Sequence, residues 1–266
     1  AFLVNRNNEL SLRDLALDLQ AISVVARDPS LEGDDTGRNE VRIRQRHVRQ
    51  KLIDELGEAF TRAMWFGLDR VDVVTNQLTL LQYASRLCDE IYPTSPKLVN
   101  ELINRDHLST NISKARRELL YAMLARETEA KLGFDGFPPA YALYLSMLVS
   151  LHRCQDNVWG FAAKPVKGKG GYRDLWDATE EFLKSRPMTS LDELFSFWRK
   201  APFGLKFGPM PILALAYYLG NRDSIAVYVG GSFQADFTSA TIDEWLVDSS
   251  ESLFVILNEE MLIGYC

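Results

Sequence analysis

A turn, an apolar helix and a two-stranded ribbon are predicted in succession near the end of the chain. Phe207-Gly208-Pro209 supplies the turn, and residues 212–219 are apolar on every side of a helix. A helix of this kind is expected to be buried. Residues 224–229 then lead through Gly230-Gly231, a dipeptide typical of hairpin turns, into a second short strand at 232–235.

The same succession occurs earlier in the chain. Its parts are a Gly/Phe/Pro turn, an apolar helix and two short strands around a polar turn, at 136–139, 141–148, 151–154 and 158–162. Helices followed by a hairpin wing are typical of the winged helix, a variant of the helix-turn-helix. The pattern therefore predicts a tandem of two winged-helix-like modules.

Helical spacing of apolar residues predicts further helices before and between these repeats. Their expected ranges are 10–25, 38–66, 77–91, 97–104, 112–126, 175–184 and 190–200, with a short helix ending at 246 and a strand at 252–257. The fold class is therefore mainly α with short β-hairpins: tandem winged-helix-like modules preceded by a helical segment.

The expected domains follow from two interruptions of this pattern. Tyr92-Pro93-Thr94-Ser95-Pro96 stops a helix, and the glycine- and lysine-rich segment 164–171 is typical of a linker. The predicted division is a helical N-terminal segment at 1–92, a first module at 93–163, and a second module with a C-terminal tail at 172–266.

Composition narrows the class of protein. Of the 266 residues, 47% are hydrophobic and 25% are charged, as in ordinary globular proteins. No apolar run reaches the length of a membrane span, and the first residues lack the features of a signal peptide. The three cysteines have no close spacing and fit a reducing compartment, so a cytoplasmic location without membrane contact is expected.

Charge is distributed unevenly along the chain. The net charge is -6, yet residues 38–51 hold six basic residues against the single Glu40. Residues 234–266 hold seven acidic residues and no Lys or Arg. A polyanion would therefore bind toward the N-terminal half, because the acidic end repels phosphate.

Two basic groups are the candidate contacts to the phosphates of double-stranded DNA. The residues are Arg42, Arg46 and Arg49 in the first group, and Arg105, Lys114, Arg116 and Arg117 in the second. The alternative, which we favour for each group, is pairing with carboxylates of neighbouring helices. The apolar helices at 141–148 and 212–219 lack side chains that could contact base edges, so sequence-specific binding through them is not expected.

The sequence shows no catalytic, metal or cofactor motif. The nearest approach to a phosphate loop, at 167–172, lacks both the Gly-x4-Gly-Lys spacing and the Ser or Thr that holds magnesium. His152 and Cys154 fall short of a four-ligand zinc site and are better explained as part of a sheet face. We therefore expect no catalytic residues, no metal and no cofactor in this chain.

Several stretches between residues 77 and 257 resemble large P-loop ATPases of bacterial phage-defence and restriction islands, of the BREX-like or phosphorothioation-linked sort. The matching stretches are 87–93, 100–105, 108–109, 115–120, 202–205 and 225–228. The resemblance implies a helical, winged-helix region outside the nucleotide-binding core, and it assigns no functional residue. The expected function is a non-catalytic module that docks an ATPase core to partner subunits of an antiviral defence assembly. The alternatives are a DNA-binding winged-helix module and an enzyme with an unrecognised site.

Overall fold

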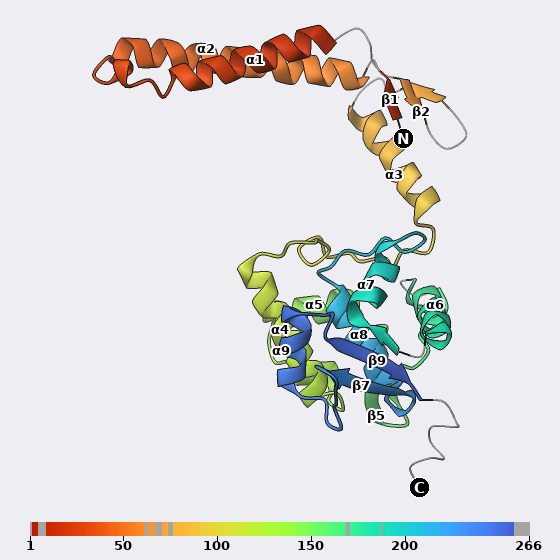
Figure 1. The fold of residues 1–266 in the computed structure, drawn as a ribbon. Coiled ribbons are helices and arrows are strands. Elements are labelled where there is room, and N and C mark those ends of the chain that lie inside the picture. Colours follow the sequence, from red (N-terminus) through yellow and green to blue (C-terminus); the bar gives the residue numbers. More distant parts are fainter. Residues whose placement is uncertain are drawn as a thin grey trace. The chain divides into compact units, whose positions relative to one another are not determined.

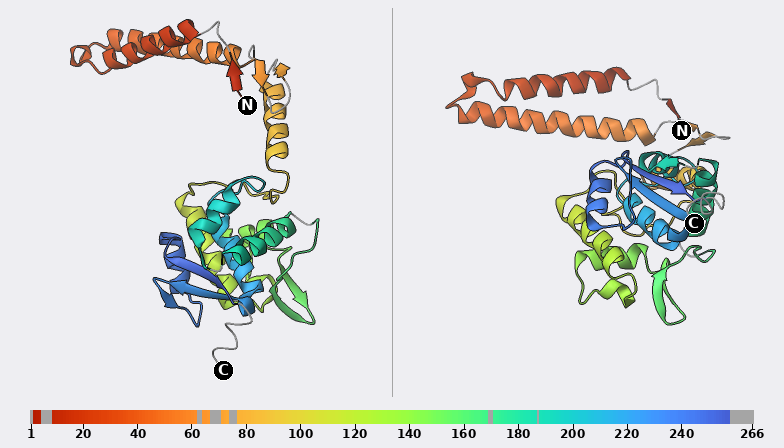
Figure 2. Two further views of the ribbon diagram at one scale, coloured as in Figure 1. Left: turned by 45° about the vertical axis from the view of Figure 1, so that its right-hand side comes forward. Right: turned by 60° about the horizontal axis from the view of Figure 1, so that its bottom comes forward.

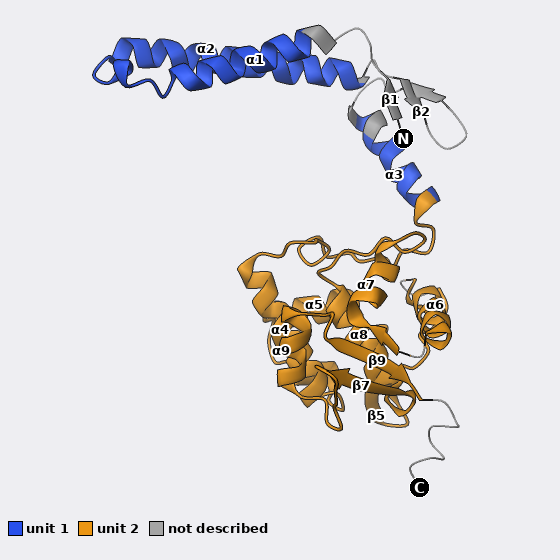
Figure 3. Cartoon of the chain, in the orientation of Figure 1, with its two compact units in different colours: residues 1–90 blue, residues 91–266 orange. Residues whose placement is uncertain are grey.

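The structure is a computed structural model that describes residues 2–4, 9–61, 64–66, 71–73, 77–168, 171–186 and 188–257. It is mainly helical with small antiparallel sheets, which confirms the predicted class at this level (Figure 1). The chain divides into two compact units, residues 1–90 and residues 91–266 (Figure 3).

Unit 1 is built on a pair of antiparallel helices, α1 (Glu9–Val25) and α2 (Asp35–Thr61), joined through the short 3-10 helix η1 (Pro29–Leu31). The helices meet along one seam, where Val48 is buried and the Gln45 amide donates to the Ser23 hydroxyl at 3.1 Å. A single seam leaves most of each helix surface exposed.

A small sheet and one more helix complete unit 1. Strands β1 (Phe2–Val4), β2 (Met64–Phe66) and β3 (Val71–Val73) pair antiparallel in the order β1-β2-β3, and α3 (Gln77–Ile91) follows. The helix predicted for 38–66 is wrong at its end, because 64–66 is a strand. The large apolar and aromatic side chains of this stretch suit a strand, and pairing with two neighbours prevails over helical spacing.

Unit 2 is organised around α8 (Met210–Gly220), whose residues from Met210 to Tyr217 are all buried. It contacts α4 (Thr110–Ala125) and β5 (Val158–Phe161), and Tyr217 packs edge-on against Trp176 of α6 (Tyr172–Ser185) with ring centroids 5.6 Å apart. The prediction that this apolar helix is buried is confirmed.

Two glycines allow close approach around α8. A Cβ on Gly208 would lie 2.0 Å from the carbonyl oxygen of Ile103, and a Cβ on Gly220 would lie 2.8 Å from that of Ala162. Both contacts involve backbone, which cannot move aside as a flexible side chain would. Glycine at these positions therefore lets the backbone at Ile103 and at Ala162 pack directly against the two ends of α8.

A four-stranded antiparallel sheet lies beside α8, in the order β6-β9-β7-β8. Its strands are β6 (Met188–Ser190), β9 (Ser252–Ile256), β7 (Ile225–Val229) and β8 (Ser232–Phe233). The first strand is short and passes directly into α7 (Leu191–Arg199), where Ser190 and Glu193 form a capping box. Helix α9 (Ser239–Val247) is inserted between β8 and β9, and the 3-10 helix η3 (Arg222–Ser224) precedes β7.

The first predicted ribbon is present as the hairpin of β4 (His152–Gln155) and β5, which projects from the unit (green in Figure 2). Its two turn residues, Asp156 and Asn157, have φ of 49° and 64°, as a tight type I′ turn requires. Helix α5 (Pro139–Met147) precedes the hairpin, and the short η2 (Ala130–Gly133) precedes α5.

The helix predicted for 97–104 is wrong, because this stretch forms turns. The side chain of Asn100 accepts a hydrogen bond from the Leu102 N–H at 3.0 Å, and the Arg105 N–H bonds the Ile103 carbonyl at 2.8 Å. Local side-chain bonds of this kind compete with the helical pattern. Ile103 alone within 97–104 has a side chain fully enclosed in the core.

One continuous core spans both predicted modules. It runs from Ile103 through residues of α4, α5 and α6 to Phe254, and α4 contacts both α8 and α9. The segment 164–171, expected as a domain boundary, therefore does not separate two cores. Residues 93–163 and 172–257 lie in the same compact unit.

We expect Gly208→Ala to destabilise unit 2 by about 3 kcal/mol, because overpacking against fixed backbone cannot relax. Gly57→Ala is the matched control: Gly57 lies within α2 and a Cβ there meets nothing within 4 Å, so alanine should stabilise unit 1 by about 0.5–1 kcal/mol through helix propensity. Urea unfolding checks both changes. Tryptophan fluorescence follows mainly unit 2, which holds Trp159, Trp176, Trp198 and Trp245, whereas unit 1 holds Trp65 alone; circular dichroism follows the helices of both units. Similar midpoint shifts for both variants would contradict the packing argument.

Candidate functional site

The first basic group forms a continuous face on α2. Arg42, Arg46 and Arg49 are all exposed, at spacings of four and three residues that place them on one side of the helix. They are offset from the seam residues that contact α1. The first and the last are seven positions apart, which is about 10 Å along the helix axis.

These three arginines have no carboxylate partner among the described residues. The alternative of neighbouring ion pairs is therefore not realised for this group within the described part of the chain. Their charges face solvent and add to one another, which is the arrangement that attracts a polyanion.

The second basic group is dispersed by the fold. Arg105 and Lys114 are exposed, and the Arg105 Nε donates to the carbonyl of Glu101 at 3.1 Å. Arg116 and Arg117 are adjacent in sequence but face different surroundings, one the interior and one the surface. These four residues do not form one phosphate-binding face.

Arg116 is a core residue, which corrects its assignment as a DNA contact. Only 7% of the residue is exposed, its Nη1 donates to the Gly208 carbonyl at 3.3 Å, and its guanidinium lies over the ring of Phe207 with 5.6 Å to the centroid. Burial, with a smaller contribution from the neighbouring charge of Arg117, lowers the pKa of Arg116 to about 10. The group stays charged at neutral pH and holds the turn before α8 against α4.

Arg117 belongs to a polar clamp between α4 and α9. Its Nε lies 3.1 Å from Asp243, and the Tyr121 hydroxyl donates to the same carboxylate at 2.7 Å. That hydrogen bond is the main reason why the pKa of Tyr121 is raised. For Arg117 the favoured alternative, an ion pair with a neighbouring helix, is therefore observed.

The region around α9 is acidic. Asp243, Glu244, Asp248 and Glu251 line a hollow of about 640 Å³ between α9 and the β7–β8 turn. Phosphate would be repelled from this side of unit 2. Neither this hollow nor any other part of the described chain gathers three or more residues suited to holding a metal ion.

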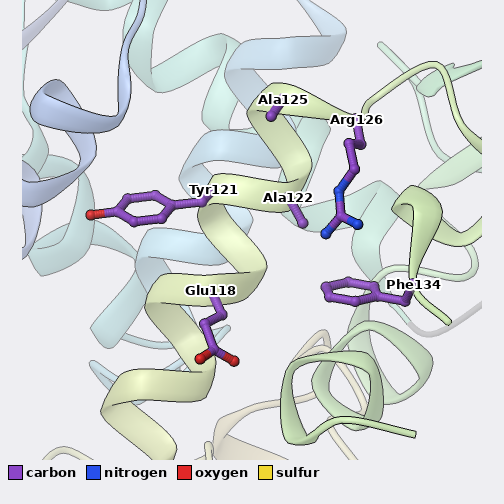
Figure 4. Close-up of a pocket in the computed structure, with 6 residues that line it drawn as sticks. All are labelled: Glu118, Tyr121, Ala122, Ala125, Arg126 and Phe134. Carbon is purple, nitrogen blue, oxygen red and sulfur yellow. The ribbon is translucent and has the colours of Figure 1, made fainter. Parts of the chain in front are cut away.

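A small pocket of about 350 Å³ lies along α4 and is lined by Glu118, Tyr121, Ala122, Ala125, Arg126 and Phe134 (Figure 4). The Arg126 guanidinium lies over the Phe134 ring at 4.9 Å from its centroid and donates to the Gly133 carbonyl at 3.0 Å. Tyr121 extends away from Phe134 toward Asp243. The pocket therefore brings together no nucleophile, base and orienting group.

His152 has a structural role in the hairpin. Its Nε2 lies 2.6 Å from the Glu127 carbonyl oxygen, and its Nδ1 lies 3.2 Å from the Tyr144 hydroxyl. A neutral ring that donates through Nε2 and accepts at Nδ1 satisfies both contacts. Burial lowers the pKa of His152, which favours this neutral form, and Cys154 on the same strand is exposed.

A groove that sequence analysis missed lies between α5 and the β4–β5 hairpin. Its volume is about 470 Å³, and its walls include Tyr141, Leu145, Val149 and Trp159. Leu145 is 47% exposed, although it belongs to the apolar helix expected at 141–148, and Val149, one residue beyond that helix, is 52% exposed. The sequence offers no signal for this exposure, because it depends on which side of α5 the core covers.

Within the described residues, no helix combines the length and the apolar character needed to cross a membrane. Comparison with known protein families, with curated proteins and with solved structures finds no match to this chain.

We expect Arg116→Ala to destabilise unit 2 by about 2–4 kcal/mol, because it removes a buried side chain and a desolvated cation–π contact. Arg117→Ala should cost no more than about 1 kcal/mol, as is usual for an exposed ion pair. Arg116→Met, which keeps most of the volume without the charge, should be the milder change at this position. Urea unfolding followed by tryptophan fluorescence gives the three values. Equal, small losses for Arg116→Ala and Arg117→Ala would show that Arg116 is not a core residue.

Proposed function

We propose that the chain is a non-catalytic interaction module that docks an ATPase core to partner subunits of a bacterial anti-phage defence assembly. The observation that carries the docking function is the burial of α8. In a DNA-binding winged helix the corresponding helix enters the major groove. Here its side chains are enclosed in the core, so that mode of binding is closed to it.

We further propose that residues 172–257 form a winged helix with an enlarged wing. The order of elements supports this: helix α6, strand β6, helices α7 and α8, then strands β7 and β9, with β9 pairing between β6 and β7. Strand β8 and helix α9 are then an insertion in the wing. Residues 93–163 would be a reduced counterpart, with α4, α5 and the β4–β5 hairpin packed against the complete one.

The surface of unit 2 supports contact with protein over contact with DNA. Arg116 and Arg117 are used within the unit, and the side of the insertion is acidic. Apolar side chains are exposed instead, among them Phe137 at 89% and Val149 at 52%. Apolar patches exposed on a protein surface mark interaction sites. The identity of the assembly rests on the resemblance of residues 77–257 to phage-defence ATPases.

A second candidate function, contact with nucleic acid, is favoured by one observation on unit 1. The arginine face of α2 is exposed and has no carboxylate partner among the described residues. Such a face would bind phosphates without reading sequence. This function and docking by unit 2 do not exclude each other, because they use different units.

We expect the tagged full chain, purified from cells that naturally produce it, to bring down a P-loop ATPase in fixed stoichiometry. Apolar docking should persist at about 0.5 M salt, because it does not depend on released counterions. Mass spectrometry of the eluate, with the unfused tag as control, provides the measurement. A chain that elutes alone at low and high salt contradicts the docking function.

We expect Arg42→Gln/Arg46→Gln/Arg49→Gln to lower affinity for a fluorescent 25-base-pair duplex at least about tenfold at 50 mM salt, and to reduce the salt slope by up to about three phosphate contacts. Arg105→Gln/Lys114→Gln is the matched control on exposed cations of unit 2 and should leave binding unchanged. Fluorescence anisotropy at two salt concentrations measures both. Equal binding by both variants would remove the arginine face of α2 as the contact surface.

A further inference from the structure

We infer that the groove between α5 and the β4–β5 hairpin binds an acidic peptide segment of a partner protein, with apolar side chains as its anchors. This inference rests on the proposed docking function and names the surface and the partner chemistry. It draws on the apolar stripe of the groove, on its charges and on the rigidity of its walls.

The apolar stripe follows the outward side of α5. Tyr141, Leu145 and Val149 recur every four residues, so they lie one above another along the helix and just beyond its end. The inward side of the same helix, with Leu143 and Met147, is buried in the core. Tyr141 is itself only 7% exposed, so Leu145 and Val149 form the part of this stripe that the described chain leaves uncovered.

The walls of the groove are held in place from several directions. Trp159 lies on β5, and its ring centroid is 5.1 Å from that of His152, whose own contacts to Glu127 and Tyr144 fix the hairpin against α5. The Tyr141 ring stacks on Tyr144 at 5.8 Å. A groove with fixed aromatic walls loses little conformational entropy when a peptide enters.

The charges of the groove are of one sign. Lys131 and Arg153 belong to its lining, and the described lining includes no carboxylate. Glu127, whose backbone carbonyl bonds the groove residue His152, has its carboxylate engaged by Arg222. A peptide with a carboxylate beside its apolar anchors would be complementary to this lining, and a basic peptide would be repelled.

Arg153 is also incompletely satisfied. Its Nε donates to the Ser150 carbonyl at 2.8 Å, but its Nη2 is buried and has no hydrogen-bond partner among the described residues. A buried N–H group without an acceptor is costly. A carboxylate entering the groove would supply an acceptor once the guanidinium turned toward it.

Single-stranded nucleic acid is the competing occupant, because aromatic and basic side chains together can stack bases and bind phosphates. The aliphatic groups of Leu145 and Val149 favour a peptide, since bases stack on aromatic rings. Two cations also make a short track for a phosphate backbone. The peptide is therefore the occupant that the observations favour.

The test is selection of random dodecapeptides displayed on phage against the immobilised full chain. Selected peptides should be enriched in Asp or Glu next to aromatic or aliphatic residues. Leu145→Asp/Val149→Asp should weaken their binding at least about tenfold, because charges then line the apolar stripe. The matched control is Val247→Asp. Val247 is an exposed apolar residue on α9 outside the groove, so this variant should bind the selected peptides with the same affinity as the unchanged chain.

Reversal of the groove charge tests the electrostatic part separately. Lys131→Glu/Arg153→Glu should select basic peptides in place of acidic ones. This variant also keeps the test decisive if circular dichroism shows that Leu145→Asp/Val149→Asp does not fold. Failure to select any peptide, absence of acidic enrichment, or an equal loss with Val247→Asp would overturn the inference. A 20-mer of thymidine is the competitor. If it displaces the peptides, and if its own binding to the chain needs Tyr141 and Trp159, the occupant of the groove is nucleic acid and not a peptide.

The same variants separate this inference from the docking function itself. If the co-purified ATPase stays bound to Leu145→Asp/Val149→Asp, docking stands and its location in the groove is wrong. If no ATPase co-purifies with the unchanged chain but acidic peptides are selected, the groove stands and the proposed assembly is wrong.

Discussion

Burial of α8 is the constraint on which the rest of unit 2 depends. A helix that is apolar on every side must be covered on every side, because each exposed large side chain forfeits about 1.5–3 kcal/mol of transfer free energy. Helices α4 and α6, the hairpin strand β5 and the four-stranded sheet supply that cover from parts of the chain far apart in sequence. A consequence is that the two sequence repeats share one core: the first repeat forms part of the cover for the helix of the second.

The same constraint determines what each basic residue does. When α4 packs against α8, Arg116 is carried into the interior over Phe207, while Arg117 is left at the edge beside Asp243. The arginines of α2 experience no such packing, because unit 1 has only one seam between its long helices. Basic residues that look equivalent in sequence therefore differ in the structure: some are buried, some form ion pairs and some face solvent. The extent to which their helix packs against neighbouring elements decides which of these applies.

The sequence pattern predicted secondary structure correctly wherever interactions within a few residues decide it. Helices α1, α4, α6 and α7 and the first hairpin lie close to their predicted ranges, since helical spacing, caps such as Ser190 and the Asp156-Asn157 turn act within a few residues. The same pattern gave wrong predictions where the structure differs from the local helical preference. The strand at 64–66 needs β1 and β3, and the turns at 97–104 follow from side-chain bonds of Asn100 that compete with the helix.

The features of the candidate sites also divide into those that the sequence predicts and those that depend on tertiary contacts. The sequence by itself determined the helical class, the buried state of residues 212–219 and the basic character of α2, because composition and periodicity are local quantities. Only the tertiary structure decided that the repeats share one core, that Arg116 is buried, and that Leu145 and Val149 remain exposed beside two cations. The physical reason is that the exposure of a side chain depends on contacts between segments far apart in sequence. An apolar run predicts that a helix is buried, but it does not say which side of the helix the other segments cover.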